Sequence, residues 1–476
     1  MRKTFPFLLF LFLLLCLGAC AELSTPEPSE APLRRTRYEI EAELLTDTHT
    51  LNVTTTIRYT LPQDLAAVKL RLYANAYQEA VVSPSKVSAA YPVGFDRGWC
   101  EVVSISGSED LPSYDIGVED PTVLTVRLAS KHKRGDELTL SLRTVIRLAN
   151  VKHRLGYDSD SYTLSGFYPV ICPFEDGKYR TDTYYPYGDP FLHETSDFDV
   201  TLALPVNMEA AASSLPLDLR TEGKRAIRRY QAAEMREFAC VASPRLLYRE
   251  DRSGDVTVRY YYEKDSKYAE TLACIREAVT TFEAAFGSHP YPSFTVVQAP
   301  FFEAGMEFSG LAIVNKELSA SERKRAILHE TAHEWWHGKV GSDEVRHPWQ
   351  DEALAEYSVL YFYACHHEDS IVKKAVDDAT EEYVIYASLK GDAPVSHPLS
   401  LGEDGYVETT YRKGLLMMIS LAEIKGYDEV NRALRAYTDR HANAVASPDA
   451  FLEAMQDLTD DPDYFDRWLY TPLPLE

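Results

Sequence analysis

A short run of residues in the second half of the chain has the residue types and spacing that metal-dependent chemistry requires. Residues 327–336 read Ile-Leu-His-Glu-Thr-Ala-His-Glu-Trp-Trp, so His329 and His333 stand four positions apart and Glu330 follows the first histidine. Positions four apart share one face of a helix, so both imidazoles can reach one ion while the glutamate lies beside the open coordination position. Zinc is the metal expected for this pattern. The same string also arises by chance, in which case both histidines are surface residues.

A carboxylate further along completes a candidate ligand set. Glu352 lies nineteen positions after His333, near the start of the next predicted helix. Two imidazoles and one carboxylate leave a fourth position for water, as a catalytic rather than a structural zinc requires. Taken alone, Glu352 is typical of a solvated helix residue. Beside the two histidines and Glu330 it resembles the third ligand of the gluzincin metallopeptidases, which implies one zinc ion.

The segment before the motif is similar to that of the aminopeptidase N family of gluzincins. Residues 304–308 read Ala-Gly-Met-Glu-Phe where that family carries Gly-Ala-Met-Glu-Asn, on the strand that borders the active-site cleft. The resemblance implies that Glu307 holds the free ammonium of a peptide substrate by a charge-assisted contact, with Gly305 and Met306 beside the substrate. The chain departs from the family at Ala304 and Phe308, so an endopeptidase with the same metal chemistry is an alternative.

A tyrosine after the motif resembles another functional residue of that family. Residues 411–414 read Tyr-Arg-Lys-Gly, which is similar to the family's Tyr-x-Lys-Gly segment, whose tyrosine hydrogen-bonds the tetrahedral intermediate. A phenol with a pKa near 10 stays protonated at neutral pH and can donate a hydrogen bond to a developing oxyanion. Tyr411 is therefore the candidate. Tyr406 is a second one, although most of the 31 tyrosines are expected to serve packing.

Together these residues predict a zinc-dependent peptidase that removes N-terminal residues from peptides. Zinc lowers the pKa of a bound water toward about 7, so that the water can give up a proton. Glu330 is the residue expected to take this proton as general base and to return it as general acid. Glu356, one turn after Glu352, is predicted to hydrogen-bond a zinc histidine. His337 is not expected to be a ligand because the set is already complete. From a different functional class, a peptide-binding lipoprotein that keeps zinc without turnover is an alternative.

The surrounding sequence divides into two parts of different character. From residue 37 to about 248, short runs such as 38–44 and 53–59 alternate polar with β-branched and aromatic residues, which is the strand signature. We predict an antiparallel β domain over residues 37–248, similar to the family's saddle-like N-terminal sheet. Residues 249–476 begin with strands and continue with helices, which predicts an α+β catalytic domain that the resemblance makes thermolysin-like. The expected helices are 267–286, 322–337, 348–365, 371–389, 411–424, 428–443 and 448–458.

The beginning of the chain carries a targeting pattern. Arg2 and Lys3 precede an apolar run at 5–17 that is too short to span a membrane, and residues 17–20 read Leu-Gly-Ala-Cys. This ending resembles the lipobox of bacterial lipoproteins, which implies a signal peptide over 1–19 and acylation of Cys20. Residues 20–36 are then a flexible tether. The expected location is the bacterial cell envelope, anchored by lipid and facing outside the cytoplasm; an ordinary leader and a core helix are the alternatives.

The composition of the chain limits which kinds of binding partner are expected. The chain has 476 residues and a formal net charge of −24, which repels phosphate backbones, so nucleic acid is not an expected partner. Peptide substrates and a membrane, through the anchor, are the expected ones, and the sequence does not indicate an oligomeric state. Five cysteines remain after Cys16 and Cys20 are set aside, and none forms a CxxC pair, so a disulfide framework is not indicated.

Overall fold

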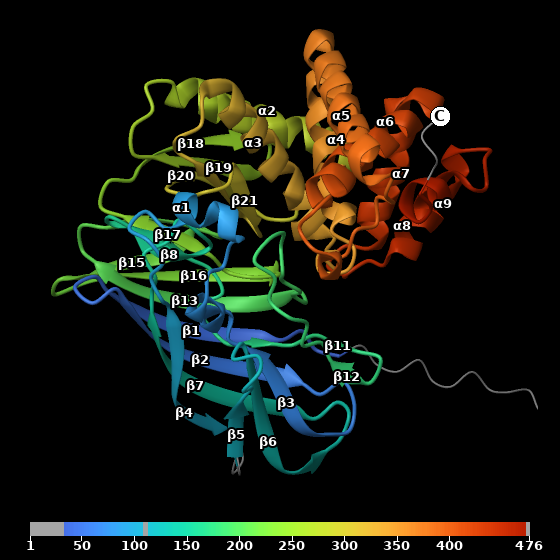
Figure 1. Ribbon diagram of the computed structural model, residues 1–476. Coiled ribbons are helices and arrows are strands. Elements are labelled where there is room, and N and C mark those ends of the chain that lie inside the picture. The colour runs from blue at the N-terminus through green and yellow to red at the C-terminus, as the bar shows by residue number, and fades with distance from the viewer. Residues whose placement is uncertain (1–32, 108–112, 473–476) are drawn as a thin grey trace, which may run out of the picture.

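The computed structural model describes residues 33–107 and 113–472. Figure 1 shows two parts, one made of strands and the other of a smaller sheet with helices gathered around and beside it. The α+β class expected from the sequence is confirmed by this arrangement. The division predicted between residues 248 and 249 remains a prediction, and it falls inside strand β18 (Leu247–Ser253).

A seven-stranded sheet is the main element of the first part. Successive side chains point to opposite faces, and along β1 this places Tyr38, Ile40, Ala42 and Leu44 in the core. The sheet is antiparallel, as the sequence predicts, except that β1 and β13 run parallel. These two strands are far apart in sequence, so the long connection that a parallel pair needs is available. In spatial order the strands are β15 (Pro216–Glu222), β16 (Arg225–Met235), β13 (Ser196–Pro205), β1 (Arg37–Leu45), β2 (Thr50–Thr60), β7 (Glu137–Arg147) and β4 (Trp99–Gly107).

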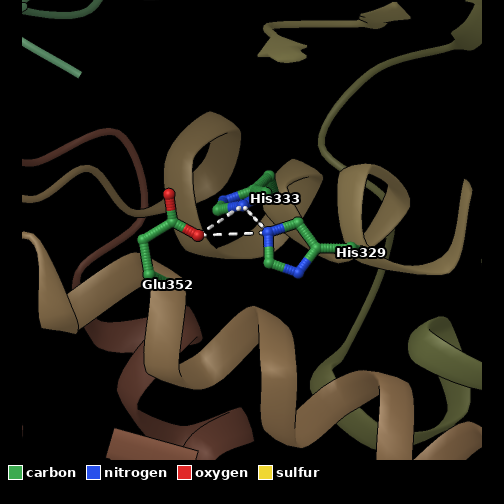
Figure 2. Close-up of side chains that lie close together, drawn as sticks. All are labelled: His329, His333 and Glu352. Carbon is green, nitrogen blue, oxygen red and sulfur yellow. Dashed lines mark hydrogen bonds and ion pairs between the residues drawn. The ribbon is translucent and has the colours of Figure 1, made fainter. Parts of the chain in front are cut away.

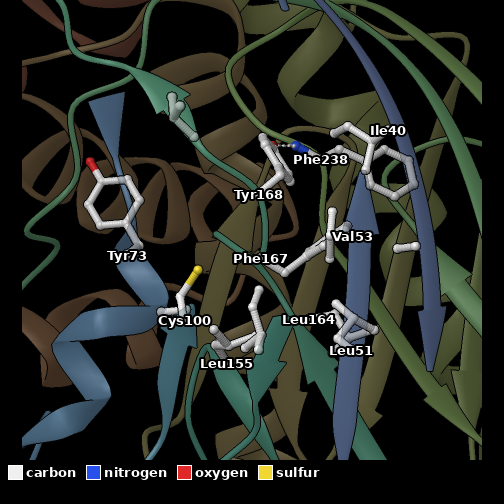
Figure 3. Packing of buried hydrophobic residues seen from close by; sticks show 14 of the residues in the cluster. Ile40, Leu51, Val53, Tyr73, Cys100, Leu155, Leu164, Phe167, Tyr168 and Phe238 are labelled. Atoms are coloured by element: carbon white, nitrogen blue, oxygen red, sulfur yellow. Dashed lines mark hydrogen bonds between the residues drawn. The ribbon is translucent and has the colours of Figure 1, made fainter. Parts of the chain in front are cut away.

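Smaller sheets pack against this one around a shared hydrophobic core. Figure 3 shows part of the core, where Phe167, Tyr168 and Phe238 pack near Ile40 and Val53. The Tyr168 hydroxyl accepts a 2.8 Å hydrogen bond from the Phe238 backbone N–H, so the polar end of the ring is satisfied inside the core. The strands are β10 (Val170–Ile171), β3 (Leu65–Arg71), β6 (Val123–His132) and β5 (Ser113–Ile116); β14 (Glu209–Ala212), β17 (Cys240–Ser243), β9 (Ser161–Leu164) and β8 (Leu155–Asp158); and the hairpin β11 (Phe174–Glu175) and β12 (Lys178–Tyr179).

A mixed five-stranded sheet supports the second part. Its three inner strands are parallel, and β18 and β21 pair antiparallel at the two edges. Strands β17 and β18 are separated around Pro244, which has no backbone N–H to donate. Edge strand β21 is the one that carries Glu307. In spatial order the strands are β18, β19 (Val256–Tyr262), β20 (Ser293–Ala299), β22 (Leu311–Asn315) and β21 (Gly305–Phe308).

Helices form the rest of the second part, close to the predicted ranges. Two predicted helices differ, because a π-helical turn at Glu334–Lys339 overlaps the end of the helix predicted at 322–337, and another at Val407–Lys413 overlaps the start of the helix predicted at 411–424. Trp335 and Trp336 are buried in the core between the helices. Within the residues that the structure describes, no helix has both the length and the apolar character needed to cross a membrane. The helices are α1 (Val87–Ala90) in the first part, and α2 (Tyr268–Phe286), α3 (Ala320–His333), α4 (Trp349–Cys365), α5 (Asp369–Lys390), α6 (Gly414–Lys425), α7 (Tyr427–Arg440), α8 (Pro448–Met455) and α9 (Tyr464–Leu469) in the second.

Candidate metal centre and active-site cleft

Helix α3 supplies the first two candidate ligands. The helix begins with a capping box, in which the Ser319 hydroxyl accepts from the Glu322 backbone N–H and the Glu322 carboxylate accepts from the Ser319 backbone N–H. This cap fixes the start of the helix before the motif. His329 and His333 then lie one turn apart on the same face, with their Nε2 atoms 3.1 Å from each other.

Glu352 reaches the same point from the first turn of α4, as Figure 2 shows. Its Oε2 lies 3.1 Å from His329 Nε2 and 3.5 Å from His333 Nε2. Ligands that are about 2.0–2.2 Å from a tetrahedral zinc lie roughly 3.3–3.5 Å from one another, close to these spacings. The three side chains therefore fit a zinc ion, and because His329 and Glu352 also line a cleft, a fourth ligand can enter from there.

Glu356 holds the far side of one of these imidazoles. Its Oε1 lies 3.0 Å from His329 Nδ1, and its other oxygen contacts the guanidinium of Arg325. The two residues are therefore in contact, as the spacing predicts, although the contact is an ion pair and His329 Nδ1 makes no hydrogen bond among the described residues. Although burial lowers it, the carboxylates of Glu352 and Glu356 raise the pKa of His329 well above its ordinary value. The surroundings of this imidazole thus favour a positive charge, which a zinc ion provides.

Glu330 lies beside the three ligands in the wall of the cleft. The residue is buried, and its Oε2 has no hydrogen-bond partner among the described residues. Burial raises the pKa of the carboxyl group to about 8, and the Glu352 carboxylate adds to the rise. A Cβ on Gly305 would lie 2.2 Å from Glu330 Oε1, so a larger residue at this position would require the Glu330 side chain to shift. An unpartnered carboxyl group with a pKa near neutrality is suited to general base catalysis.

Glu307 approaches the same place from β21. Its carboxylate oxygen and the ligand atoms of Glu330 and His333 all lie within 4.8 Å of one another. The residue is buried, and its Oε1 has no hydrogen-bond partner among the described residues. Burial, together with the nearby carboxylates of Asp189 and Glu330, raises the pKa of Glu307 well above its ordinary value. A cation that enters the cleft would relieve this repulsion.

Tyr411 contacts the ligand set directly. Its Oη donates a 2.5 Å hydrogen bond to Glu352 Oε1, whereas the hydroxyl of Tyr406 is buried without a hydrogen-bond partner among the described residues. The two rings pack with their centroids 5.8 Å apart, and both residues line the cleft. Burial raises the pKa of both phenols well above 10, so both remain protonated and able to donate.

Residues of the first part complete the cleft, which encloses about 500 Å³. The Arg154 guanidinium contacts the Asp189 carboxylate, donates to the Gly188 carbonyl oxygen at 3.1 Å, and places Nε 2.9 Å from the sulfur of Met306. Sequence analysis did not identify these residues as part of the cleft. A single arginine and a single aspartate far apart on loops have no spacing that sequence analysis can detect.

His337 points away from the ligands into a second buried group. Its Nδ1 lies 2.7 Å from Glu344 Oε1, and its Nε2 lies 3.1 Å from Glu237 Oε2. Glu237 comes from the first part and also lies 3.3 Å from His193 Nδ1. Each ring nitrogen of His337 therefore lies at ion-pair distance from a carboxylate. Glu237 and Glu344 were missed because no motif surrounds them.

The lipidation site predicted at Cys20 lies outside the described residues, as does most of the predicted tether.

Comparison with known sequences connects this cleft to a family. Residues 269–468 match the sequence model of the Peptidase family M1 domain. Aminopeptidase M1 of Arabidopsis thaliana is 25% identical over 286 residues, which cover 54% of this chain and 32% of that protein. Aminopeptidase N of Escherichia coli is 23% identical over 237 residues, which cover 46% of this chain and 27% of that protein. The chain thus spans about a third of the length of these curated relatives.

Comparison with solved structures extends the likeness to nearly the whole chain. An M1 zinc metallopeptidase from Deinococcus radiodurans superimposes with a TM-score of 0.68 at 16% identity, covering 93% of this chain and 95% of the other. At this identity the likeness establishes the shared fold, with its N-terminal β part and α+β catalytic part. The matched residues include the candidate zinc ligands, Glu330, Glu307 and Tyr411. Residues 269–468 therefore match an M1 peptidase domain, and together with the aminopeptidase relatives this match supports an aminopeptidase N-family gluzincin.

Proposed function

We propose that this chain is a zinc-dependent aminopeptidase, which removes N-terminal residues from peptides. The position of Glu307 is the observation that carries the proposal. One of its carboxylate oxygens lies within 4.8 Å of ligand atoms of Glu330 and His333, and its Oε1 has no hydrogen-bond partner among the described residues. The amino nitrogen and the carbonyl carbon of one residue are only two bonds apart. When Glu307 holds a free ammonium, the first peptide bond is therefore the one beside Glu330.

The two departures from the family segment do not alter this position. Phe308 is buried and packs in a hydrophobic cluster with Phe301, Leu311 and Ile313, and it does not line the cleft. At Ala304 the backbone carbonyl oxygen accepts a 3.0 Å hydrogen bond from Asn315 N, which continues the pairing of β21 with β22. Neither residue moves Glu307, which favours the aminopeptidase over the endopeptidase alternative.

The residues around the cleft have distinct tasks in this reaction. His329, His333 and Glu352 would hold the zinc ion, which when bound would lower the pKa of a water molecule and polarise the carbonyl group that is attacked. Glu330 takes a proton from that water on its free oxygen and returns it to the leaving amine. Tyr411 donates its hydroxyl proton in a hydrogen bond to the carbonyl oxygen as negative charge develops there. Glu307 holds the ammonium group and so fixes which bond is presented.

The substrate class has support from a relative. The structure of a Deinococcus radiodurans M1 zinc metallopeptidase variant contains a bound Tyr-Ser-Ala substrate, and that protein shares the fold with a TM-score of 0.64 at 16% identity. We extend short peptides as substrates to this chain.

Hydrolysis of a panel of free and N-blocked aminoacyl reporter amides tests the proposal. The purified protein would be assayed with zinc, with a chelator, and as Glu330→Gln. Zinc-dependent cleavage of the free-amine reporters alone, lost in the variant, is the expected result. Cleavage of blocked peptides alone would establish the endopeptidase, and zinc binding without turnover would establish a peptide-binding protein.

We also propose that the chain is a lipoprotein of the bacterial cell envelope, anchored at Cys20 and facing outside the cytoplasm. The support is sequence order alone: two cations, an apolar run and Leu-Gly-Ala-Cys at residues 17–20. The test is fractionation of cells that express the chain, with mass spectrometry of its N-terminal peptide. The expected result is an acylated Cys20 in the membrane fraction and release of Cys20→Ser. An unmodified Cys20 would contradict the proposal.

A further inference from the structure

Carboxylates outnumber cations on the wall of the cleft, and most of them already have a role or a partner. Glu307, Glu330 and Glu352 belong to the machinery described above. The remaining acids that line the cleft are Asp189, Glu303, Glu322, Glu356 and Glu403, and the cations are Lys86, Arg154, Arg325 and Arg412. Four of these five acids are accounted for: Asp189 contacts Arg154, Glu356 contacts Arg325, Glu403 lies 3.1 Å from Lys86, and Glu322 closes the capping box of α3.

Glu303 is the acid that remains. It has no hydrogen-bond or ion-pair partner among the described residues, and the fourth cation, Arg412, is paired with Glu382. Glu303 is half-buried at the cleft, and burial raises the pKa of its carboxyl group while Arg154 opposes the rise. A partly desolvated carboxylate is stabilised by a cationic partner in direct contact, and among the described residues Arg154 and Lys86 act on Glu303 only from beyond ion-pair distance.

The chain around Glu303 is held in place before any ligand arrives. On one side, Phe302 N donates a 3.1 Å hydrogen bond to the Lys152 carbonyl oxygen, and on the other, Asn315 N donates a 3.0 Å hydrogen bond to the Ala304 carbonyl oxygen. The Phe302 ring also stacks on His153, with centroids 5.5 Å apart and 19° between the planes. Little ordering is therefore needed for Glu303 to receive a ligand.

We propose that Glu303 selects substrates whose first residue carries a cationic side chain, lysine or arginine. The inference rests on the proposed function, because it requires Glu307 to hold the ammonium of that same residue. The ammonium group and the side chain of the first residue are attached to the same Cα. The first side chain therefore enters the part of the cleft beside Glu307. Glu303 stands four residues before Glu307 on the same wall. An ammonium or guanidinium group gives Glu303 a charge-assisted contact, whereas an uncharged side chain leaves it unpaired.

Paired reporters that differ only in side-chain charge test this selection. The kcat/KM of zinc-loaded full chain would be compared for lysine and norleucine aminoacyl amides. We expect a preference for lysine of about tenfold or more. Glu303→Gln should remove most of that preference with little change for norleucine, and Glu303→Asp, which keeps the charge, should retain part of it. Glu403→Gln is the matched control, because that carboxylate lines the same cleft but already contacts Lys86.

A binding measurement separates failure of this inference from failure of the proposed function. Calorimetry on the zinc-loaded Glu330→Gln protein, with and without the added Glu303→Gln change, would compare lysinamide with norleucinamide. Tighter binding of lysinamide that depends on Glu303 supports the inference even if no reporter is hydrolysed. Equal binding of both amides, or a preference that survives Glu303→Gln, would overturn it while hydrolysis of norleucine reporters still upheld the aminopeptidase.

Discussion

Two groups of histidines and carboxylates lie along one helical segment, and they are built differently. The zinc group consists of His329, His333 and Glu352, and the bridging group consists of His337, Glu237 and Glu344. In the zinc group, three ligand atoms converge with separations of 3.1, 3.1 and 3.5 Å beside a cleft. In the bridging group, one imidazole lies between two carboxylates, at 2.7 and 3.1 Å on its opposite nitrogens.

The comparison shows that residue type and proximity do not by themselves make a metal site. His337, Glu344 and Glu307 also have ligand atoms within 4.8 Å of one another, as the zinc group does. In the zinc group, lone pairs of three ligand atoms point to one position. In the bridging group, the carboxylate lone pairs instead face the N–H groups of the imidazole. Although burial lowers it, Glu237 and Glu344 raise the pKa of His337 well above its ordinary value, so this imidazole is charged. The bridging group is therefore an ionic link between the two parts of the chain.

The largest effect is expected at the acid and base beside the zinc group. Glu330→Gln removes proton transfer but keeps the size of the side chain, so kcat should fall by about 10²- to 10⁴-fold. Zinc content and melting temperature should stay near those of the unchanged protein, because Glu330 is outside the ligand set. Steady-state kinetics and metal analysis check this prediction. A variant that keeps most of its kcat would remove Glu330 from the mechanism.

The bridging group should respond in the opposite way. His337→Gln leaves Glu237 and Glu344 buried without their cation, so the free energy of unfolding should fall by about 3–5 kcal/mol. Zinc stoichiometry should not change, because the zinc group is intact. Urea titration and metal analysis of the same samples check both statements. Loss of zinc with unchanged stability would show that the roles of the two groups have been exchanged.

The same variant gives a pH dependence with a definite sign. His337 has a raised pKa in the folded protein, so its stabilising effect is complete below the unfolded-state pKa of about 6.5 and is lost as pH rises through the folded-state pKa. The stability difference between the unchanged protein and His337→Gln should therefore be widest near pH 6 and narrow above it. Urea titrations at a series of pH values from 6 to 9 measure this difference. A constant difference would mean that His337 is neutral.

Sequence reasoning was most informative where the chemistry is local. The four-residue spacing of His329 and His333 predicts a shared helix face, and the spacing from Glu352 to Glu356 predicts a second contact on His329, which the structure contains. Alternating strands and periodic helices also follow from local pattern, which is why the α+β class could be predicted. The π-helical turn at Glu334–Lys339 could not, because it is a tertiary feature that no residue spacing marks.

Sequence reasoning failed where partners come from the other part of the chain. Glu237 meets His337 across 100 positions, and Arg154 reaches Met306 across 152. Neither contact leaves a pattern in one sequence, because each is made by the packing of one sheet against another element. The same holds for Glu303, whose importance lies in the partner that it lacks. Such residues are recognised only in the structure, when each charged side chain around the cleft is matched with its partner.

Tyr411 is expected to contribute to catalysis but not to zinc binding. Tyr411→Phe removes one hydrogen-bond donor from the cleft, and kcat should fall by about 10²- to 10³-fold while zinc is retained. Tyr406→Phe is the matched control, since its hydroxyl lies in the same wall but does not contact the ligand set. A larger loss at Tyr406 than at Tyr411 would reverse the assignment of the two tyrosines.

The smallest effect is expected at Glu356 and Glu344, the carboxylates that contact the Nδ1 atom of an imidazole in each group. Glu356 contacts His329 at 3.0 Å and Glu344 contacts His337 at 2.7 Å, so both orient an imidazole through Nδ1. If only the zinc group binds metal, Glu356→Gln should weaken zinc binding by about 10- to 100-fold, and Glu344→Gln should lower stability instead. Competition with a fluorescent chelator measures the zinc affinity of each variant. Equal zinc affinity in the two variants would mean that the orientation of His329 does not depend on Glu356, and the division between the groups would then rest on the ligand atoms alone.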